Sequence, residues 1–290
     1  MTLLTLDQVN ALDAGAFAAA FAAVYEHSPW VAGQAAALRP FASVTAMAAT
    51  FAGIVAAAGD DAKLALLMAH PDLAGRAAVR GDLTAHSRLE QASAGLDSLT
   101  AEEMAAFTRA NADYRLRFGF PFILAVKHWG KAHILAAFRG RLDNSPAAER
   151  ATALAEVDKI AFSRLLALIE PAPGGRLTTH VLDTARGRPA AGLGIELARL
   201  EGGAETVVRQ DVTNADGRLD QPLLAGAEMA VGLWRLTFSA GEYFLASGQT
   251  LTAPAFLDLV PIRFHIDNPE QHYHVPLLVT PWSYSTYRGS

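Results

Sequence analysis

The feature that most constrains the fold of this chain is a change of residue pattern near residue 170. From residue 1 to about residue 169, alanine and leucine recur at helical spacing with few β-branched runs, a pattern that predicts helices. After the segment EPAPGG at 170–175, short alternating runs are separated by Gly, Asp and Asn turns, which is typical of strands. We therefore predict an all-helical domain at 1–170 and a β-rich domain at 171–290.

Local signals mark where several helices begin. Asp13 precedes the run AGAFAAAFAAVYEH, Thr100 and Glu103 have the spacing of a capping box, and the Ser-Pro pair at 145–146 opens a segment that continues to about residue 169. The most apolar stretch, residues 44–59, is mostly alanine and is shorter than the roughly 20 strongly apolar residues of a membrane span. It predicts a buried or half-buried helix.

Composition narrows the classes of partner. The chain has 290 residues, enough for about two domains, and its formal net charge of −5 gives no electrostatic basis for binding nucleic acid. It contains no cysteine, which excludes disulfides, thiolate catalysis and cysteine-type zinc sites. The first residues lack the pattern of a secretory signal. We expect a cytoplasmic protein that acts on small molecules, with no membrane partner.

The helical half contains a group of ionisable and polar candidates. His70 directly precedes Pro71 at a predicted helix end, where the helix dipole favours an imidazolium. Ser87, Glu90 and Gln91 stand at i, i+3 and i+4, so on a helix they share one face. The alternative is that His70 is a capping residue and that Glu90 and Gln91 are solvated surface, and spacing alone favours this alternative.

Four sequence motifs of this half carry more information than the spacing of single residues. HPDLAG, SRLEQASAGL, FGFPFI and EVDKIAFSRL together resemble the 2-oxo-4-hydroxy-4-carboxy-5-ureidoimidazoline (OHCU) decarboxylase family of the urate pathway, over most of residues 5–169. The resemblance implies an all-α bundle that acts as a dimer. It also implies a site lined by His70, Pro71, Ser87, Glu90, Gln91 and Arg164.

The chemistry of such a site needs no cofactor. Decarboxylation leaves an electron pair that the C=N bond of the substrate ring can accept. We expect His70 and Glu90 to handle the hydroxyl and ring protons, in a division that the sequence leaves open. Arg164, Ser87 and Gln91 would fix the polar groups of the substrate. Alternatively, Arg164 is a helix-surface residue engaged in ion pairs.

The β half has its own set of candidates. His180 lies in a strand pattern at 177–183, and Arg218 follows the turn signature TNADG. His272 and His274 share one face of a strand at i, i+2. The alternatives are a buried, satisfied histidine at 180 and a solvated hairpin arginine at 218. An HxH pair can also ligate a metal, but no flanking acid completes a ligand set, so no metal is expected.

Four motifs of the β half, THVLD, TNADGR, HYHVPLL and the terminal YSTYRGS, resemble the transthyretin-like 5-hydroxyisourate hydrolases over residues 176–290. The resemblance implies a two-sheet β-sandwich with one short helix, expected within residues 240–248, and a tetramer whose sites lie in a channel shared between subunits. The matching residues are His180, Arg218, His274, Tyr287, Arg288, Gly289 and Ser290.

The side chains of this set suggest a hydrolysis without metal or covalent intermediate. His180 or His274 would deprotonate a water that attacks the ring amide, and Arg218 would stabilise the oxyanion. Ser290 either hydrogen-bonds the water or substrate, or helps Arg288 to hold the channel wall.

Together the two resemblances imply a bifunctional enzyme that converts 5-hydroxyisourate through OHCU to (S)-allantoin, with chain order opposite to reaction order. One alternative is that only one half is active and the other is a scaffold. Another is that the β half is a transthyretin-like small-molecule binding module, since fold alone does not decide function. Retention of the polar set in the β half favours the enzyme.

Overall fold

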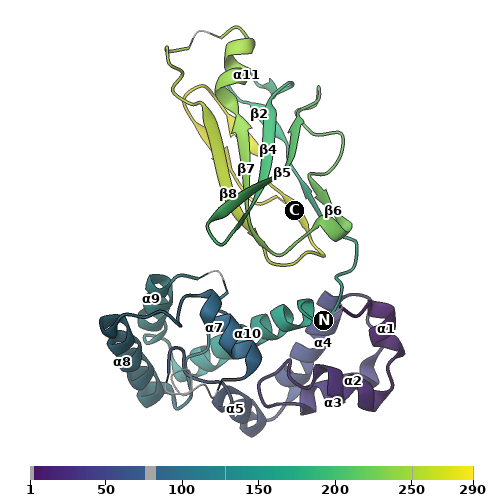
Figure 1. Ribbon diagram of the computed structural model, residues 1–290, viewed down its shortest axis with the longest axis vertical. Helices are drawn as coiled ribbons and strands as arrows, with labels where there is room; N and C mark the ends of the chain where they lie inside the picture. The colour runs from purple at the N-terminus through teal and green to yellow at the C-terminus, as the bar shows by residue number, and fades with distance from the viewer. Residues whose placement is uncertain (1–2, 76–82, 128, 250, 290) are drawn as a thin grey trace. The chain divides into compact units, whose positions relative to one another are not determined.

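The computed structural model describes residues 3–75, 83–127, 129–249 and 251–289 (Figure 1). The chain divides into two compact units, Met1–Glu170 and Pro171–Ser290. Each unit has its own cluster of buried hydrophobic residues. The predicted fold class is confirmed, because the first unit is built from helices and the second from β-sheets.

The first unit is helical throughout its described elements. The predicted starts are confirmed: Asp13 Oδ1 accepts from Ala16 N at 2.8 Å, Thr100 forms a capping box, and the Ser145 side chain caps the longest helix. The elements are α1 Leu6–Ala11, α2 Ala14–Phe21, α3 Trp30–Ala35, the 3₁₀ turn η1 Ala36–Leu38, α4 Val44–Ala57, α5 Asp60–Met68, α7 Ala85–Ser93, α8 Ala101–Phe118, α9 Lys131–Arg141 and α10 Pro146–Leu166.

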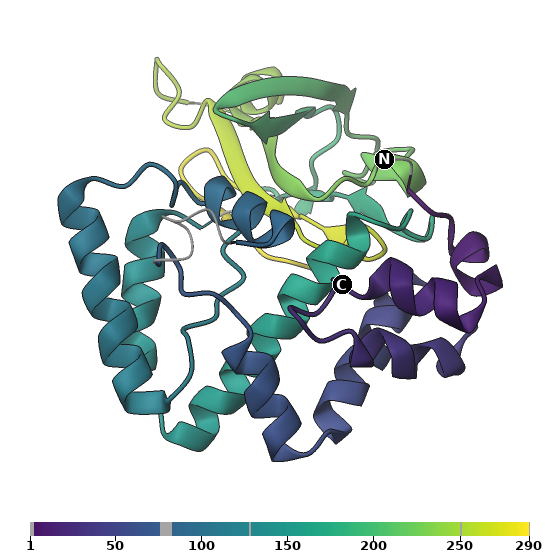
Figure 2. The same ribbon diagram turned by 60° about the horizontal axis from the view of Figure 1, so that its bottom comes forward.

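Helix α10 is the centre of this unit, as Figure 2 shows. It packs against α4 and α5. Helix α4 turns Val44, Met47, Phe51 and Val55 inward, and this spacing of three and four residues places them on one face of a helix. The prediction of a buried or half-buried helix is therefore confirmed, as a helix with one buried face. Within the described ranges, no helix is both long and apolar enough to cross a membrane.

Helix α2 ends at Phe21, so the prediction of a helix through the whole run to His27 was wrong. The physical reason lies in the partners of the next residues. The carbonyls of Ala23 and Val24 accept from Arg164 Nη1 at 3.3 and 3.4 Å. The side chain of Glu26 turns inward, and tertiary contacts thereby replace the last helical turns.

The second unit consists of two β layers around one buried cluster (Figure 1). One layer has the strand order β5-β4-β7-β8. The other is formed by β6-β1-β9 and β11-β10-β2-β3. The strands are β1 Arg176–Thr178, β2 Val181–Asp183, β3 Arg188–Pro189, β4 Gly194–Glu201, β5 Ala204–Val212, β6 Leu224–Ala225, β7 Gly232–Ser239, β8 Leu259–Ile266, β9 His272–His274, β10 Leu277–Val279 and β11 Tyr284–Thr286, with the 3₁₀ turn η2 Gly226–Glu228.

The predicted strand at 177–183 is interrupted, and its middle supplies a site residue. Strands β1 and β2 flank Thr179 and His180. The buried Thr179 donates its hydroxyl to the Val275 carbonyl at 2.7 Å, while His180 forms an isolated bridge with Arg218. The Thr178 and His180 carbonyls still accept from Val275 N at 3.0 Å and Leu277 N at 2.9 Å, so the backbone stays beside the neighbouring segment across this break. The predicted short helix is confirmed as α11, Ala240–Ala246.

Candidate active sites

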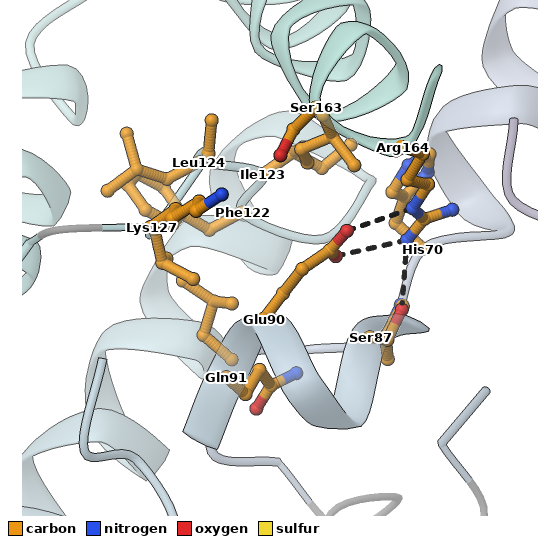
Figure 3. A pocket seen from close by; sticks show the side chains of 15 residues that line it. His70, Ser87, Glu90, Gln91, Phe122, Ile123, Leu124, Lys127, Ser163 and Arg164 are labelled. Carbon is orange, nitrogen blue, oxygen red and sulfur yellow. Dashed lines mark hydrogen bonds and ion pairs between the residues drawn. The ribbon is translucent and has the colours of Figure 1, made fainter. Parts of the chain in front are cut away.

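A pocket in the helical unit gathers residues from four parts of the sequence (Figure 3). The space in it that protein atoms do not fill is about 520 Å³, part of which is open solvent at its mouth. All six residues expected at the helical site line it. The full lining is His70, Pro71, Leu73, Ser87, Glu90, Gln91, Phe122, Ile123, Leu124, Ala125, Val126, Lys127, Ile160, Ser163 and Arg164.

His70 lies two residues beyond the last residue of α5 and is only 6% exposed. Its Nδ1 is 2.9 Å from the Leu66 carbonyl oxygen. A carbonyl can only accept, so Nδ1 carries a hydrogen and the lone pair of the neutral ring is on Nε2. Burial is the main reason that the pKa of His70 is lowered. The ring is therefore neutral at physiological pH and can act as a base through Nε2.

Arg164 is the hub of a buried ionic cluster. Its Nε is 2.9 Å from Glu90 Oε1 and its Nη2 is 3.0 Å from Glu90 Oε2, a two-pronged pair visible in Figure 3. Its Nη1 is 2.8 Å from Glu26 Oε2. Burial alone would raise the pKa of the Glu26 carboxyl, but Arg164 and the Thr84 hydroxyl outweigh it and lower that pKa.

All the nitrogens of Arg164 are engaged within the protein. Besides the two carboxylates, Nη2 donates to Ser87 Oγ at 3.3 Å, and Nη1 also contacts the Ala23 and Val24 carbonyls. A guanidinium has only five N–H donors. The structure thus agrees with the alternative in which Arg164 is engaged in ion pairs, although these pairs are buried rather than on the surface. In this arrangement Arg164 orients Glu90 at the pocket.

Gln91 also uses its side chain within the protein. Its Oε1 accepts from Ala74 N at 3.0 Å, and its Nε2 is 3.4 Å from the Asp72 carbonyl. The buried amide therefore holds the loop that follows Pro71. Ala74 has φ 51°, in the left-handed region, which is unfavourable for alanine. The bond from Gln91 helps to maintain this conformation.

The wall opposite helix α7 is the extended segment 120–127. Its backbone is anchored at two points: the Ile123 carbonyl accepts from Arg141 Nη1 at 2.6 Å, and Ala125 N donates to Glu156 Oε2 at 2.9 Å. Its apolar side chains face the pocket. Lys127 ends the segment, and Figure 3 shows its side chain at the rim, across the pocket from His70. Among the described residues, none pairs with the Lys127 ammonium.

In the β unit, His180 and Arg218 are adjacent through an isolated antiparallel bridge. Burial, followed by the Arg218 charge, lowers the pKa of His180. His180 Nε2 is buried without a hydrogen-bond partner in the described structure. The backbone just before Arg218 lies so close to strand β2 that position 217 requires glycine. Its φ is +69°, and a Cβ there would lie 2.3 Å from the Val181 carbonyl oxygen.

His274 is the second imidazole of this cluster. Burial is the first cause of its lowered pKa, and the charge of Arg218 is the second. Thr178 Oγ1 lies 2.9 Å from His274 Nδ1 and 2.8 Å from His272 Nε2. Parallel pairing of β1 with β9 places Thr178 directly beside His274. His180, Arg218 and His274 are thus brought together, as expected.

The chain end packs on this cluster. Gly289 N donates to the His274 carbonyl at 2.8 Å, and a Cβ at Gly289 would lie 2.7 Å from His274 Cδ2. Only glycine allows the tail to approach the imidazole so closely. Arg288 lies over the Tyr273 ring at 4.6 Å. Tyr287 is exposed, and Ser290 lies outside the described residues.

Three residues in these clusters were missed from the sequence. Glu26 stands in a run that predicts a helix, and a lone acid among apolar residues was its only signal. Lys127 lies four residues after the FGFPFI segment, and Thr178 lies two residues before His180. Within the described structure, no group of three or more metal-ligating side chains lies close enough to hold a metal ion.

The fold and the two clusters define a class of protein in which an all-α unit with an acid–base pocket is fused to a β-sandwich with a histidine–arginine cluster. The profile of the OHCU decarboxylase family matches residues 10–166, and that of the HIUase/Transthyretin family matches residues 177–289. The chain therefore belongs to both families, one through each unit. The predicted fusion is confirmed.

Curated relatives match one unit each. 5-Hydroxyisourate hydrolase 2 of Rhizobium meliloti (strain 1021) is 60% identical over 116 residues, which cover 40% of this chain and 97% of that protein. The 2-oxo-4-hydroxy-4-carboxy-5-ureidoimidazoline decarboxylase of Haloferax volcanii is 48% identical over 162 residues, which cover 56% of this chain and 94% of that protein. The crystal structure of (S)-allantoin synthase covers 99% of this chain and 100% of its own, with a TM-score of 0.84 and 41% identity.

Proposed function

We propose that this chain is a bifunctional enzyme of urate degradation. Its second unit hydrolyses 5-hydroxyisourate to OHCU, and its first unit decarboxylates OHCU to (S)-allantoin. The observation that carries the proposal is the similarity over 99% of the chain to a solved (S)-allantoin synthase. The polar clusters found in both units support it, because each contains groups suited to the chemistry of its step.

For the decarboxylation, we assign proton transfer to His70. Its Nε2 takes the hydroxyl proton of the substrate while the C–C bond to the carboxylate breaks, and the released electron pair moves into the ring C=N bond. The imidazolium then gives this proton to the adjacent ring carbon as the C–O bond becomes a carbonyl, and a proton from solvent neutralises the ring nitrogen that received the electron pair, so protons and electrons balance. Glu90, held by Arg164 from behind, faces the same pocket and accepts hydrogen bonds from the substrate.

Substrate binding requires a positive charge that the buried cluster does not provide. Glu26 and Glu90 contribute two negative charges and Arg164 one positive charge, so this cluster is net negative. An anionic carboxylate substrate is repelled by such a cluster. Lys127 lines the same pocket and is unpaired among the described residues. We assign to it the attraction of the substrate carboxylate.

For the hydrolysis, we assign the general base to His274 or His180 and oxyanion stabilisation to Arg218. Both imidazoles have lowered pKa values, so both are neutral and can accept a proton from water at physiological pH. Arg218 lies close enough to affect both rings electrostatically. The packing of Gly289 against His274 supports a role for the chain end in forming the site wall.

We also propose that the protein self-associates. The edge strand β5 exposes Val207, Val208 and Val212, with 48%, 46% and 57% of their surface accessible. An edge strand with exposed apolar side chains is a surface suited to association. Light scattering after size exclusion, over a hundredfold dilution range, measures the assembly directly. A monomer at every concentration would contradict this proposal.

The enzymatic proposal is tested by supplying freshly generated 5-hydroxyisourate to the purified chain. Ultraviolet absorbance follows its decay, and circular dichroism follows (S)-allantoin. We expect both steps in the parent chain. His70→Ala should leave the first step intact and let OHCU accumulate, whereas His180→Ala should slow the first step alone.

Supplying OHCU directly to His180→Ala provides the matched control, since decarboxylation should then proceed at the parent rate. If the parent chain bound 5-hydroxyisourate without consuming it, the β unit would be a binding module. If only one step occurred in the parent, the other unit would be a scaffold.

A further inference from the structure

We propose that Thr178 is a positioning residue of the hydrolase site, and that with His272 it sets which nitrogen of the His274 ring carries the proton. The inference rests on the hydrolase function proposed above. Neither Thr178 nor His272 belongs to the set that the family resemblance supplies. The proposal is carried by two contacts of one hydroxyl group.

The first step is the geometry of these contacts. Thr178 Oγ1 is 2.9 Å from His274 Nδ1 and 2.8 Å from His272 Nε2, and both distances are those of hydrogen bonds. The side chains project from neighbouring parallel strands, β1 and β9. His272 and His274 stand at i, i+2 on β9, so both rings lie on the face to which Thr178 points.

The second step is the count of protons. A threonine hydroxyl has one hydrogen, so it can donate to only one of the two rings and must accept from the other. If Thr178 donates to His272, it accepts from His274 Nδ1–H, and the lone pair of His274 is on Nε2. If it donates to His274 instead, Nε2 carries the hydrogen and His274 cannot act as a base. The two histidine tautomers are therefore coupled through this hydroxyl.

The third step is the choice between these arrangements. Only the arrangement in which His274 Nδ1 donates to Thr178 Oγ1 leaves the ring's lone pair on Nε2, the nitrogen that Thr178 does not occupy. The role of His274 as a general base, proposed above, requires that lone pair. We therefore assign the arrangement in which His274 Nε2 is the base. The hydroxyl then donates to His272 Nε2, and His272 is its outer partner.

The remaining charged and titratable groups near His274 are His180, Arg218 and His272, with Arg176 acting on His272. Burial and these neighbours keep both rings neutral, as the proton count assumes. When Nε2 takes a proton from water, Nδ1–H still donates to Thr178. The imidazolium thus keeps its support until Nε2 returns the proton to the leaving ring nitrogen.

The experiment compares Thr178→Val with Thr178→Ser in the full chain, with 5-hydroxyisourate decay as the assay. Valine keeps the shape and removes the hydroxyl, while serine keeps the hydroxyl. We expect kcat to fall about tenfold to a hundredfold in Thr178→Val, at or below the lower end of the roughly 10²–10⁴-fold range of general-base catalysis because the base itself remains, with KM nearly unchanged. Thr178→Ser should recover most of the parent rate.

A second readout is the pH profile. Removing the hydroxyl takes an acceptor from the imidazolium, so the acid limb of kcat/KM in Thr178→Val should move to lower pH. His272→Leu frees the hydroxyl to donate to His274 Nδ1, and this variant should show the same loss of kcat. Thr179→Val is the matched control, because its hydroxyl bonds a backbone carbonyl and no imidazole.

Equal hydrolysis by Thr178→Val and the parent would overturn the proposal. A loss of kcat in Thr178→Val that Thr178→Ser does not restore would also overturn it. So would a Thr179→Val variant that shows an equal loss of kcat and the same shift of the acid limb. Either result would mean that side-chain packing alone explains the effect. If the parent chain itself did not hydrolyse 5-hydroxyisourate, the proposed function would fail first, and this outcome is distinct from failure of the positioning role.

Discussion

Replacing Glu26 tests whether the buried ionic cluster holds the helical site together. Glu26 is 2% exposed and accepts from Arg164 Nη1 at 2.8 Å, Thr84 Oγ1 at 2.8 Å and Ser87 Oγ at 3.1 Å. In Glu26→Gln the amide oxygen can still face Arg164 and Ser87, while its NH₂ faces the Thr84 hydroxyl, which can rotate to accept. The variant therefore loses charge more than geometry.

The magnitude follows from the contacts. Hydrogen bonds to charged groups contribute about 1.5–3 kcal/mol, and removing one partner of a buried pair costs about 3–5 kcal/mol. The three-charge cluster becomes neutral in Glu26→Gln, which offsets part of the loss. We expect the helical unit to lose about 2 kcal/mol of unfolding free energy in Glu26→Gln and about 3–5 kcal/mol in Glu26→Ala.

The assay is guanidinium unfolding followed by circular dichroism at 222 nm, which reports mainly on the helical unit. Glu102→Gln removes an exposed carboxylate from the first turn of α8 and is the matched control. Decarboxylation by Glu26→Gln should slow through kcat, because Arg164 no longer holds Glu90 firmly, while hydrolysis is unchanged. Our reasoning is refuted if Glu26→Ala unfolds at the same denaturant concentration as the parent and the control.

Three further predictions concern single groups. Lys127→Met should raise KM for OHCU about tenfold with little change in kcat, and added salt should raise KM in the parent but much less in the variant; a kcat defect alone would contradict the binding role. Gly289→Ala should slow hydrolysis and spare decarboxylation, because the new Cβ would lie 2.7 Å from His274 Cδ2; parent-like decay of 5-hydroxyisourate would show that the tail does not shape the site. The pKa values of His180 and His274 are lowered, chiefly by burial, so both bases remain neutral until the pH falls below the ordinary histidine pKa of about 6.5. The acid limb of kcat/KM for hydrolysis should therefore have its midpoint below about pH 6.5. A midpoint above that pH would contradict the lowered pKa values.

The sequence by itself determined the local chemistry of this protein. The change of pattern at EPAPGG separates helices from strands because side-chain spacing matches the period of each structure. Asp13, Thr100 and the pair at 145–146 mark helix starts because a capping side chain needs only partners three residues away. The common face of Ser87, Glu90 and Gln91 likewise follows from helical periodicity, and all three line one pocket.

Only the tertiary structure decided which groups these residues contact. Arg164 reaches Glu90 across 74 positions of the chain, and no local pattern encodes a pair at that separation. The same long-range bonds end α2 at Phe21 and bring Glu26 into the site. In the β unit, an isolated bridge joins His180 to Arg218, and the β1–β9 pairing sets Thr178 between two imidazoles. Spacing identifies candidate groups, but burial and long-range hydrogen bonds determine which of them hold substrate, which hold each other, and which ring nitrogen is free to act as a base.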